Sequence, residues 1–178
     1  MSERALLDRI ALTDLVMRYC RGIDRRDYAL VRACYHDDAI DDHGVMFCGG
    51  PDDFVAWLPT MMANWDATIH SISNSLFAID GDSAEGEHVV MAFHRTPPPG
   101  RRELIVWGRY LDRYQRRDGV WKFLHRTLVF DHGSVNPVDE AGFAMMGADA
   151  THGTADRNDP SWAMPLLSNL AQQGHPTT

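Results

Sequence analysis

The sequence contains little cysteine and almost no lysine. Its three cysteines, Cys20, Cys34 and Cys48, are odd in number and form no Cys-x-x-Cys pair. Neither a disulfide framework nor a cysteine zinc site is therefore supported. The only lysine is Lys122, which follows Trp121 in an expected strand, so a Schiff-base mechanism is not favoured.

Long apolar runs and basic clusters are also missing. No stretch of about 18 apolar residues occurs, which argues against a spanning helix, and residues 1–4 lack a secretory signal pattern. Lys and Arg number 17 against 25 Asp and Glu, a formal net charge of -8. We expect a cytoplasmic protein that binds neither nucleic acid nor an anionic membrane.

The motifs of several enzyme classes are absent as well. The sequence has no His-Glu-x-x-His, no Gly-rich phosphate loop, no Gly-x-Ser-x-Gly and no dinucleotide fingerprint. The run Asp41-Asp42-His43 could bind a metal, but its spacing matches no known ligand set, and we interpret it as a solvated turn. No metal site is expected.

The 178 residues suit one domain, at about 150 residues per domain. The first third of this domain shows helical periodicity. The spacing of apolar residues predicts a helix over residues 5–24 and a short one over 27–36. Extended chain is expected over 39–48, and a third helix opens at Pro51 and is ended or kinked by Pro59.

The remainder of the chain favours strands. They are expected over residues 68–79, 84–95, 103–116 and 120–131, with turns at Gly81 and Gly119. Helices followed by antiparallel strands predict an α+β fold in which a curved sheet and its helices enclose a ligand pocket. Residues 133–178 predict an irregular tail with a short helix near Leu166 to Gln172.

Three stretches together resemble the SnoaL-like branch of the nuclear transport factor 2 superfold. They are Tyr19-Cys20-Arg21-Gly22-Ile23-Asp24, then Thr68-Ile69-His70, then Arg116-Arg117-Asp118-Gly119-Val120-Trp121-Lys122-Phe123 followed by Arg126. The resemblance extends to the hexachlorocyclohexane dehydrochlorinase, bile-acid 7α-dehydratase and scytalone dehydratase families. It implies a cone-shaped domain over residues 1–132. An extension over 133–178 would then pack on the pocket or on a neighbouring subunit.

The resemblance also implies site residues. In those families an Asp on the first helix pairs with a His on the sheet, and Asp24 and His70 match this dyad by position. Arg126 matches an active-site arginine on the last strand, and Tyr19 matches a tyrosine of the bile-acid dehydratases. The alternatives are that Arg126 pairs with Asp24 or with Asp131, and that Tyr19 is a buried core phenol.

Further residues are expected to bind the substrate. His94 lies close to the position of a second histidine of scytalone dehydratases, with His88 on the same strand as the alternative. Three aromatic residues would suit an aromatic substrate but are equally normal in a core: Trp57, Phe47 and Trp65.

The chemistry follows from these residue types. A neutral His accepts a proton near neutral pH, and a buried Asp fixes its tautomer. Arg126 could stabilise developing negative charge, and Tyr19 could donate a hydrogen bond. The resemblance thus implies a lyase without cofactor that removes water, or a similar small group, from a hydrophobic cyclic or aromatic substrate. It also implies a homo-oligomer, with a trimer favoured over a dimer.

Several other functions remain open. The same dyad could release formaldehyde from lignin-derived diarylpropanes, remove a halide or move a double bond. A polyketide-type cyclase would work without the dyad. A ligand-binding module, or the small subunit of a ring-hydroxylating dioxygenase, would not be catalytic, because fold does not determine function.

Overall fold

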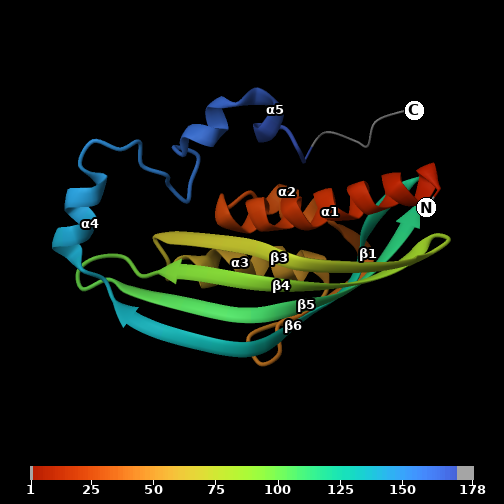
Figure 1. Ribbon diagram of the computed structural model, residues 1–178, viewed down its shortest axis with the longest axis horizontal. Coiled ribbons are helices and arrows are strands. Elements are labelled where there is room, and N and C mark those ends of the chain that lie inside the picture. Colours follow the sequence, from red (N-terminus) through yellow and green to blue (C-terminus); the bar gives the residue numbers. More distant parts are fainter. Residues whose placement is uncertain (1, 172–178) are drawn as a thin grey trace.

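The computed structural model describes residues 2–171. The elements are α1 (Glu3–Asp24), α2 (Tyr28–Ala33), β1 (Tyr35–Asp42), β2 (Cys48–Gly49), α3 (Pro51–Met62), β3 (Ala67–Asp80), β4 (Ser83–Arg95), β5 (Arg102–Arg117), β6 (Val120–Pro137), α4 (Glu140–Gly147), the 3-10 helix η1 (Pro160–Ala163) and α5 (Pro165–Ser168). The strands form one sheet in the order β2-β1-β6-β5-β4-β3, antiparallel except for the β1–β6 pair. The predicted α+β fold with a curved, mostly antiparallel sheet is confirmed (Figure 1).

Helix α1 lies along the sheet and begins where the sequence provides a cap. The Ser2 hydroxyl accepts a hydrogen bond from the Ala5 amide at 3.2 Å. The apolar stripe of the helix is buried as its periodicity predicts, ending at Ile23. Near this end, a Cβ on Gly22 would lie 2.7 Å from a Val31 methyl. Glycine therefore allows α2 to approach closely, which places the C-terminal end of α1 over the sheet.

Both long hairpins form where turn residues predict them. Gly81 between β3 and β4 has φ +57°, and Gly119 between β5 and β6 has φ +80°. The preceding Asp118 also has positive φ, 52°. These left-handed residues turn the chain tightly, so strands of 13 to 18 residues pair along most of their length.

Two boundaries near the N-terminus differ from the prediction. The second helix ends at Ala33 and not at residue 36, because Tyr35 and His36 belong to β1. The His36 ring bonds to the Gln115 carbonyl at 2.8 Å. Helix α3 continues through Pro59 to Met62, so this proline does not end the helix.

The C-terminal part is more regular than predicted. Strand β6 continues to Pro137, so irregular structure does not begin at residue 133. After α4 at one end of the sheet, the chain returns along α1 through η1 and α5 (Figure 1). Helix α5 overlaps the short helix expected near Leu166, while Gln172 lies outside the described residues. No helix in residues 2–171 is long and apolar enough to cross a membrane.

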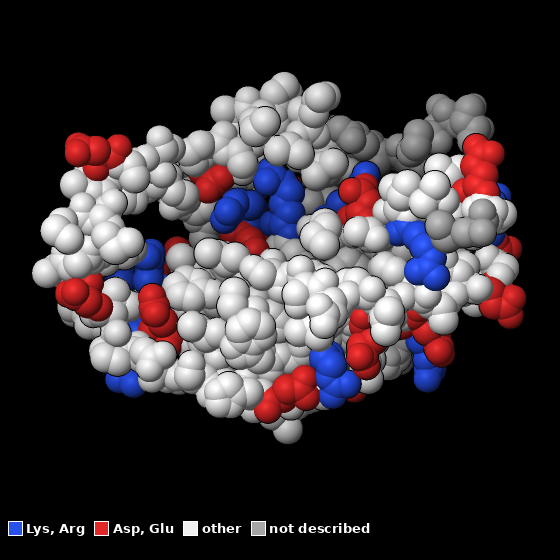
Figure 2. Space-filling model, viewed as in Figure 1, with Lys and Arg blue, Asp and Glu red and all other residues white. Residues whose placement is uncertain are grey.

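The tail is attached to α1 by charged and aromatic contacts. Asp159, which is 5% exposed, lies 3.6 Å from Arg25 and accepts bonds from the Ser161 amide at 2.9 Å and the Thr154 amide at 3.0 Å. The Arg21 guanidinium lies 5.8 Å from the Trp162 ring centre. Figure 2 shows basic side chains where the tail meets the body of the molecule.

We expect Asp159→Ala to release this part of the tail. The substitution removes one acceptor that serves the Thr154 and Ser161 amides and Arg25 together. Amide hydrogen exchange in residues 152–164 should become faster, while exchange in the sheet stays unchanged. Asp156→Ala is the control, because that exposed carboxylate bonds only within its own turn. Equal exchange in both variants would contradict the role of Asp159.

Candidate functional site

The end of α1 and the start of β3 bring Asp24 and His70 into contact. Asp24 Oδ1 lies 2.7 Å from His70 Nδ1, and Asp24 Oδ2 accepts the His70 backbone N–H at 2.8 Å. Both carboxylate oxygens therefore bind the same residue. With Asp24 as the acceptor, Nδ1 carries the ring proton and Nε2 presents a lone pair. The side chains are 9% exposed for His70 and 12% for Asp24.

The strand register surrounds His70 with small side chains. His70 pairs with Ala92, Ala92 with Val106 and Val106 with Gly133, which forms one row across four strands. Their side chains face α1, because His70 bonds to Asp24 from this face. Alanine and glycine in this row leave the ring of His70 without a bulky neighbour in the row itself.

The neighbouring rows on this face add apolar surface. Thr68, His94, Leu104 and Val135 form one row, and Val90, Gly108 and Phe130 belong to the other. Phe130 is 65% exposed and Val135 is 51% exposed. These two residues were not predicted to bind substrate, because the strand was expected to end at residue 131 and because bulges shift the register.

His94 lies beside the dyad, as expected. Its ring centre is 5.7 Å from that of His70 and 4.9 Å from that of Trp65. Burial, together with the neighbouring His70, lowers the pKa of His94 from 6.5 to about 4. His94 is therefore neutral at neutral pH, and its buried Nδ1 has no hydrogen-bond partner in the described part of the chain.

This burial predicts a loss of stability in mild acid. In the unfolded chain a histidine takes up a proton near pH 6.5, but His94 in the folded protein does so near pH 4. The unfolded state binds more protons between these values, so the free energy of unfolding falls as pH drops through this window, by about 3 kcal/mol. Urea unfolding at pH 7 and pH 4.5 should show a smaller loss for His94→Gln than for wild type. If the two losses are equal, His94 does not cause the effect.

His88, the alternative to His94, is part of the core. It is fully buried, with Nε2 2.7 Å from the Tyr114 hydroxyl and Nδ1 3.0 Å from the Ser75 hydroxyl. Both nitrogens are thus engaged, and burial lowers the pKa of this ring. Of the two histidines, His94 is the one that lies beside the dyad.

Arg126 is fully buried and pairs with Asp112. Two parallel bonds join the groups, Nε to Oδ1 at 2.8 Å and Nη2 to Oδ2 at 2.7 Å. The alternative pairings with Asp24 and Asp131 are wrong, and Asp131 instead binds Arg109. Burial alone would lower the pKa of the Arg126 guanidinium, and Asp112 more than offsets this. Its charge is therefore already matched within the protein.

Tyr19 packs on the same guanidinium. The Arg126 guanidinium lies 4.2 Å from the ring centre of Tyr19, and at similar distances from Tyr110 and Phe123. Tyr19 is 2% exposed, and burial raises the pKa of its phenol well above the usual value. No residue in the described part of the chain bonds its hydroxyl, so the phenol remains a neutral donor.

The remaining predicted aromatic residues pack around Phe54. Phe47 and Trp57 pack with Phe54 of α3, with ring centres 5.2 Å apart for Phe47–Phe54 and 6.0 Å for Phe54–Trp57. His43 stacks on the same Phe54 ring at 5.6 Å. The structure thus divides the predicted aromatic residues, since Trp65 lies with His94 and the other two lie with His43.

Asp41 and His43 are not the solvated turn that the sequence predicts. Asp41 is fully buried, and its two oxygens contact the Tyr35 hydroxyl and His43 Nδ1, each at 2.5 Å. Within residues 2–171 there is no group of His, Cys, Asp and Glu arranged to hold a metal ion. The three cysteines are free thiols, of which only Cys48 is exposed.

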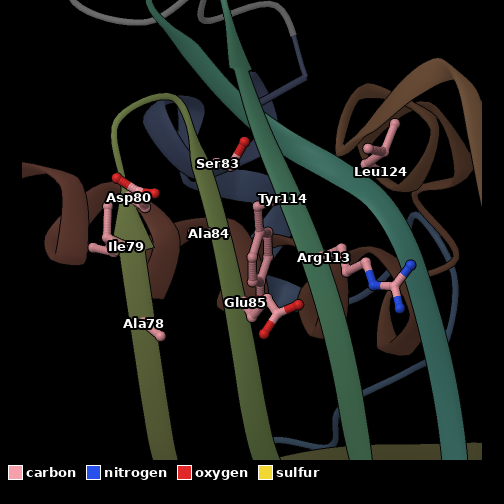
Figure 3. A pocket seen from close by; sticks show the side chains of 9 residues that line it. All are labelled: Ala78, Ile79, Asp80, Ser83, Ala84, Glu85, Arg113, Tyr114 and Leu124. Atoms are coloured by element: carbon pink, nitrogen blue, oxygen red, sulfur yellow. The ribbon is translucent and has the colours of Figure 1, made fainter.

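Two hollows lie away from these residues. One of about 360 Å³ lies beside the β3–β4 turn and is lined by Asp80, Ser83 and Tyr114 among others (Figure 3). The other, about 700 Å³, follows the outer side of α1 and reaches Leu170 and Ala171. None of the predicted site residues lines either hollow, so neither coincides with the dyad.

The sequence matches the family model of the SnoaL-like domain over residues 4–127. The chain belongs to this family. The resemblance to the nuclear transport factor 2 superfold is thereby confirmed. None of the curated proteins matches this chain by sequence.

Several solved structures share the fold. A candidate scytalone dehydratase from Novosphingobium aromaticivorans has 24% identity and a TM-score of 0.68, covering 75% of this chain and 91% of its own. A hexachlorocyclohexane dehydrochlorinase, LinA-type3 from Novosphingobium barchaimii, has 22% identity and a TM-score of 0.66, covering 76% and 93%. A variant of Rv3472, a protein of unknown function from Mycobacterium tuberculosis, has 22% identity and a TM-score of 0.64, covering 96% and 92%.

Proposed function

We propose that this SnoaL-like protein is a lyase that needs no cofactor. His70 removes a proton from carbon, and a small group leaves the adjacent carbon of a hydrophobic cyclic or aromatic substrate. The observation that carries the proposal is the contact of both Asp24 oxygens with His70, which leaves Nε2 as the proton acceptor. The solved dehydratase-like and dehydrochlorinase structures of this fold agree with such chemistry.

The surroundings of the dyad suit this reaction. His94, which is neutral at neutral pH, adds no positive charge beside His70. Tyr19 supplies a neutral hydroxyl that can bond a developing enolate oxygen. The exposed Phe130 and Val135 provide apolar surface for a ring. Water is the leaving group we favour, while loss of halide, release of formaldehyde or movement of a double bond would use the same base.

The test is turnover of cyclic ketones that carry a leaving group at the β carbon. A carbonyl makes the neighbouring C–H acidic, so one base is enough to start elimination. We expect the full-length protein to convert 3-hydroxy-1-indanone, or a homologue with one to three rings, to the conjugated enone, followed by ultraviolet absorbance. Binding of these ketones without turnover would instead favour the ligand-binding module.

We also propose a homotrimer. The face of the sheet opposite α1 carries exposed apolar side chains, with Ile69 50%, Trp107 44% and Leu111 38% exposed. Burying such side chains between subunits is favourable. Sedimentation equilibrium should give three times the 20.1 kDa chain mass. A dimer would leave the elimination proposal intact and change only the assembly.

A further inference from the structure

A second Asp–His pair lies at the end of β1 and repeats the arrangement of the first. Asp41 accepts from the Tyr35 hydroxyl with one oxygen and contacts His43 Nδ1 with the other, each at 2.5 Å. Asp24 likewise divides its oxygens between a fixed donor and His70 Nδ1. The His43 side chain keeps 12% exposure, and no residue in the described part of the chain bonds its Nε2.

His43 faces the interior that the dyad also faces. Asp41 pairs with Arg126 across the β1–β6 ladder, and both side chains are fully buried. His43 lies two residues after Asp41 and therefore points to the same side. Its ring stacks on Phe54 and lies 6.5 Å from the Tyr110 ring, which faces α1. In the strand order of this curved sheet, β6, β5 and β4 separate β1 from β3 (Figure 1).

The charged groups near His43 come from β1, β6 and β5. Asp41 contacts its Nδ1 through one carboxylate oxygen. The Arg126 guanidinium on β6 is paired with Asp112 of β5. The other elements packed against the ring contribute Phe54 of α3 and the phenol of Tyr110, neither of which is charged at neutral pH.

We propose that His43 is the general acid of the elimination. His70 Nε2 takes the proton from carbon, the electron pair forms the double bond, and the C–O bond breaks as His43 Nε2 gives its proton to the leaving oxygen. The products are the alkene and water. His70 then returns its proton to water, and His43 takes one from water. This inference rests on the proposed function and adds the residue that a poor leaving group requires.

Two substrates that differ only in their leaving group distinguish a residue that acts as the general acid from one that acts as the general base. Hydroxide needs a proton in order to leave, whereas chloride does not. The probes are 3-hydroxy-1-indanone and 3-chloro-1-indanone, which both give inden-1-one. In His43→Asn an amide N–H replaces Nδ1–H and Nε2 is lost. We expect it to lower kcat for the hydroxy probe about 10²-fold and to leave kcat for the chloro probe within about threefold. His70→Asn should lower kcat for both probes. His132→Asn, at an exposed position on β6, should lower kcat for neither probe.

The outcomes distinguish the two proposals. If His43→Asn lowers kcat equally for both probes, or for neither, then His43 is not the acid. The role of His70 as the base is unaffected by that result. A second measurement needs no turnover: 1-indanone, which lacks the leaving group, is added to the full-length protein, and histidine ring resonances are followed by NMR. Shifts of both His43 and His70 are expected. If only the His70 resonances shift, the role of His43 is overturned. If neither histidine shifts and no turnover is seen, the elimination is overturned as well.

Discussion

His70→Asn should lower kcat by about 10²- to 10⁴-fold, the usual contribution of a general base. The asparagine amide can donate to Asp24 as Nδ1 does, so the helix end keeps its contact while the proton acceptor disappears. The measurement is the initial rate of enone formation from 3-hydroxy-1-indanone at pH 7. The thermal midpoint should change little, because the hydrogen bond to the backbone amide of residue 70 is kept.

The control for this variant is His132→Asn, at an exposed position on β6. Asp24→Asn provides a second comparison. Its amide has one acceptor for two donors, so it cannot serve both the backbone N–H and Nδ1–H of His70. Full activity of His70→Asn would show that another residue accepts the proton. In that case the dyad would be a structural contact.

Asp112→Asn should be the most destabilising single substitution among the polar residues of the core. It leaves the Arg126 guanidinium buried and without a matching charge. Breaking such a pair costs about 3–5 kcal/mol, which corresponds to a fall of about 6–20 °C in Tm for a chain of this size. Urea unfolding measures the free energy directly, and calorimetry gives the midpoint.

The double variant Asp112→Leu with Arg126→Met is the informative partner. An apolar pair of similar size removes both charges together, so most of the lost stability should return. Asp131→Asn is the control, because it breaks the Arg109 pair in solvent and should leave the midpoint almost unchanged. A double variant less stable than Asp112→Asn would show that the charges stabilise the fold beyond their mutual neutralisation.

The sequence predicts the elements of this fold better than it predicts contacts within them. The hairpin at Asp118-Gly119 follows from turn chemistry alone. The pairing of Arg126 with Asp112 cannot be predicted from turn chemistry. From the turn outward, Gln115 pairs with Lys122, but a bulge between Arg113 and Tyr114 shifts the register by one residue. Arg126 therefore lies opposite Asp112, where regular pairing would place residue 125.

The site residues that belong to family motifs could be predicted from the sequence. The resemblance indicated Asp24 and His70, and the structure brings them together. Asp41 and His43 were interpreted as part of a solvated turn because their residue types are typical of one, and only their contacts with Tyr35 and Phe54 show that they are buried. The end of β6 was missed because Gly133 and Pro137 are typical of loops, although pairing with β5 keeps them in the sheet.

The position of β6 between β1 and β5 has a consequence for synthesis. Because the chain is made from its N-terminus, β1 remains without its long neighbour until the last strand has been made. About 85 residues separate Asp41 from its partner Arg126, so this pairing closes a large loop late. Folding dominated by such distant contacts is slow. Until β6 arrives, the edges of β1 and β5 that it will pair with are open to other nascent chains, so yield in expression should depend on chaperones more than final stability does.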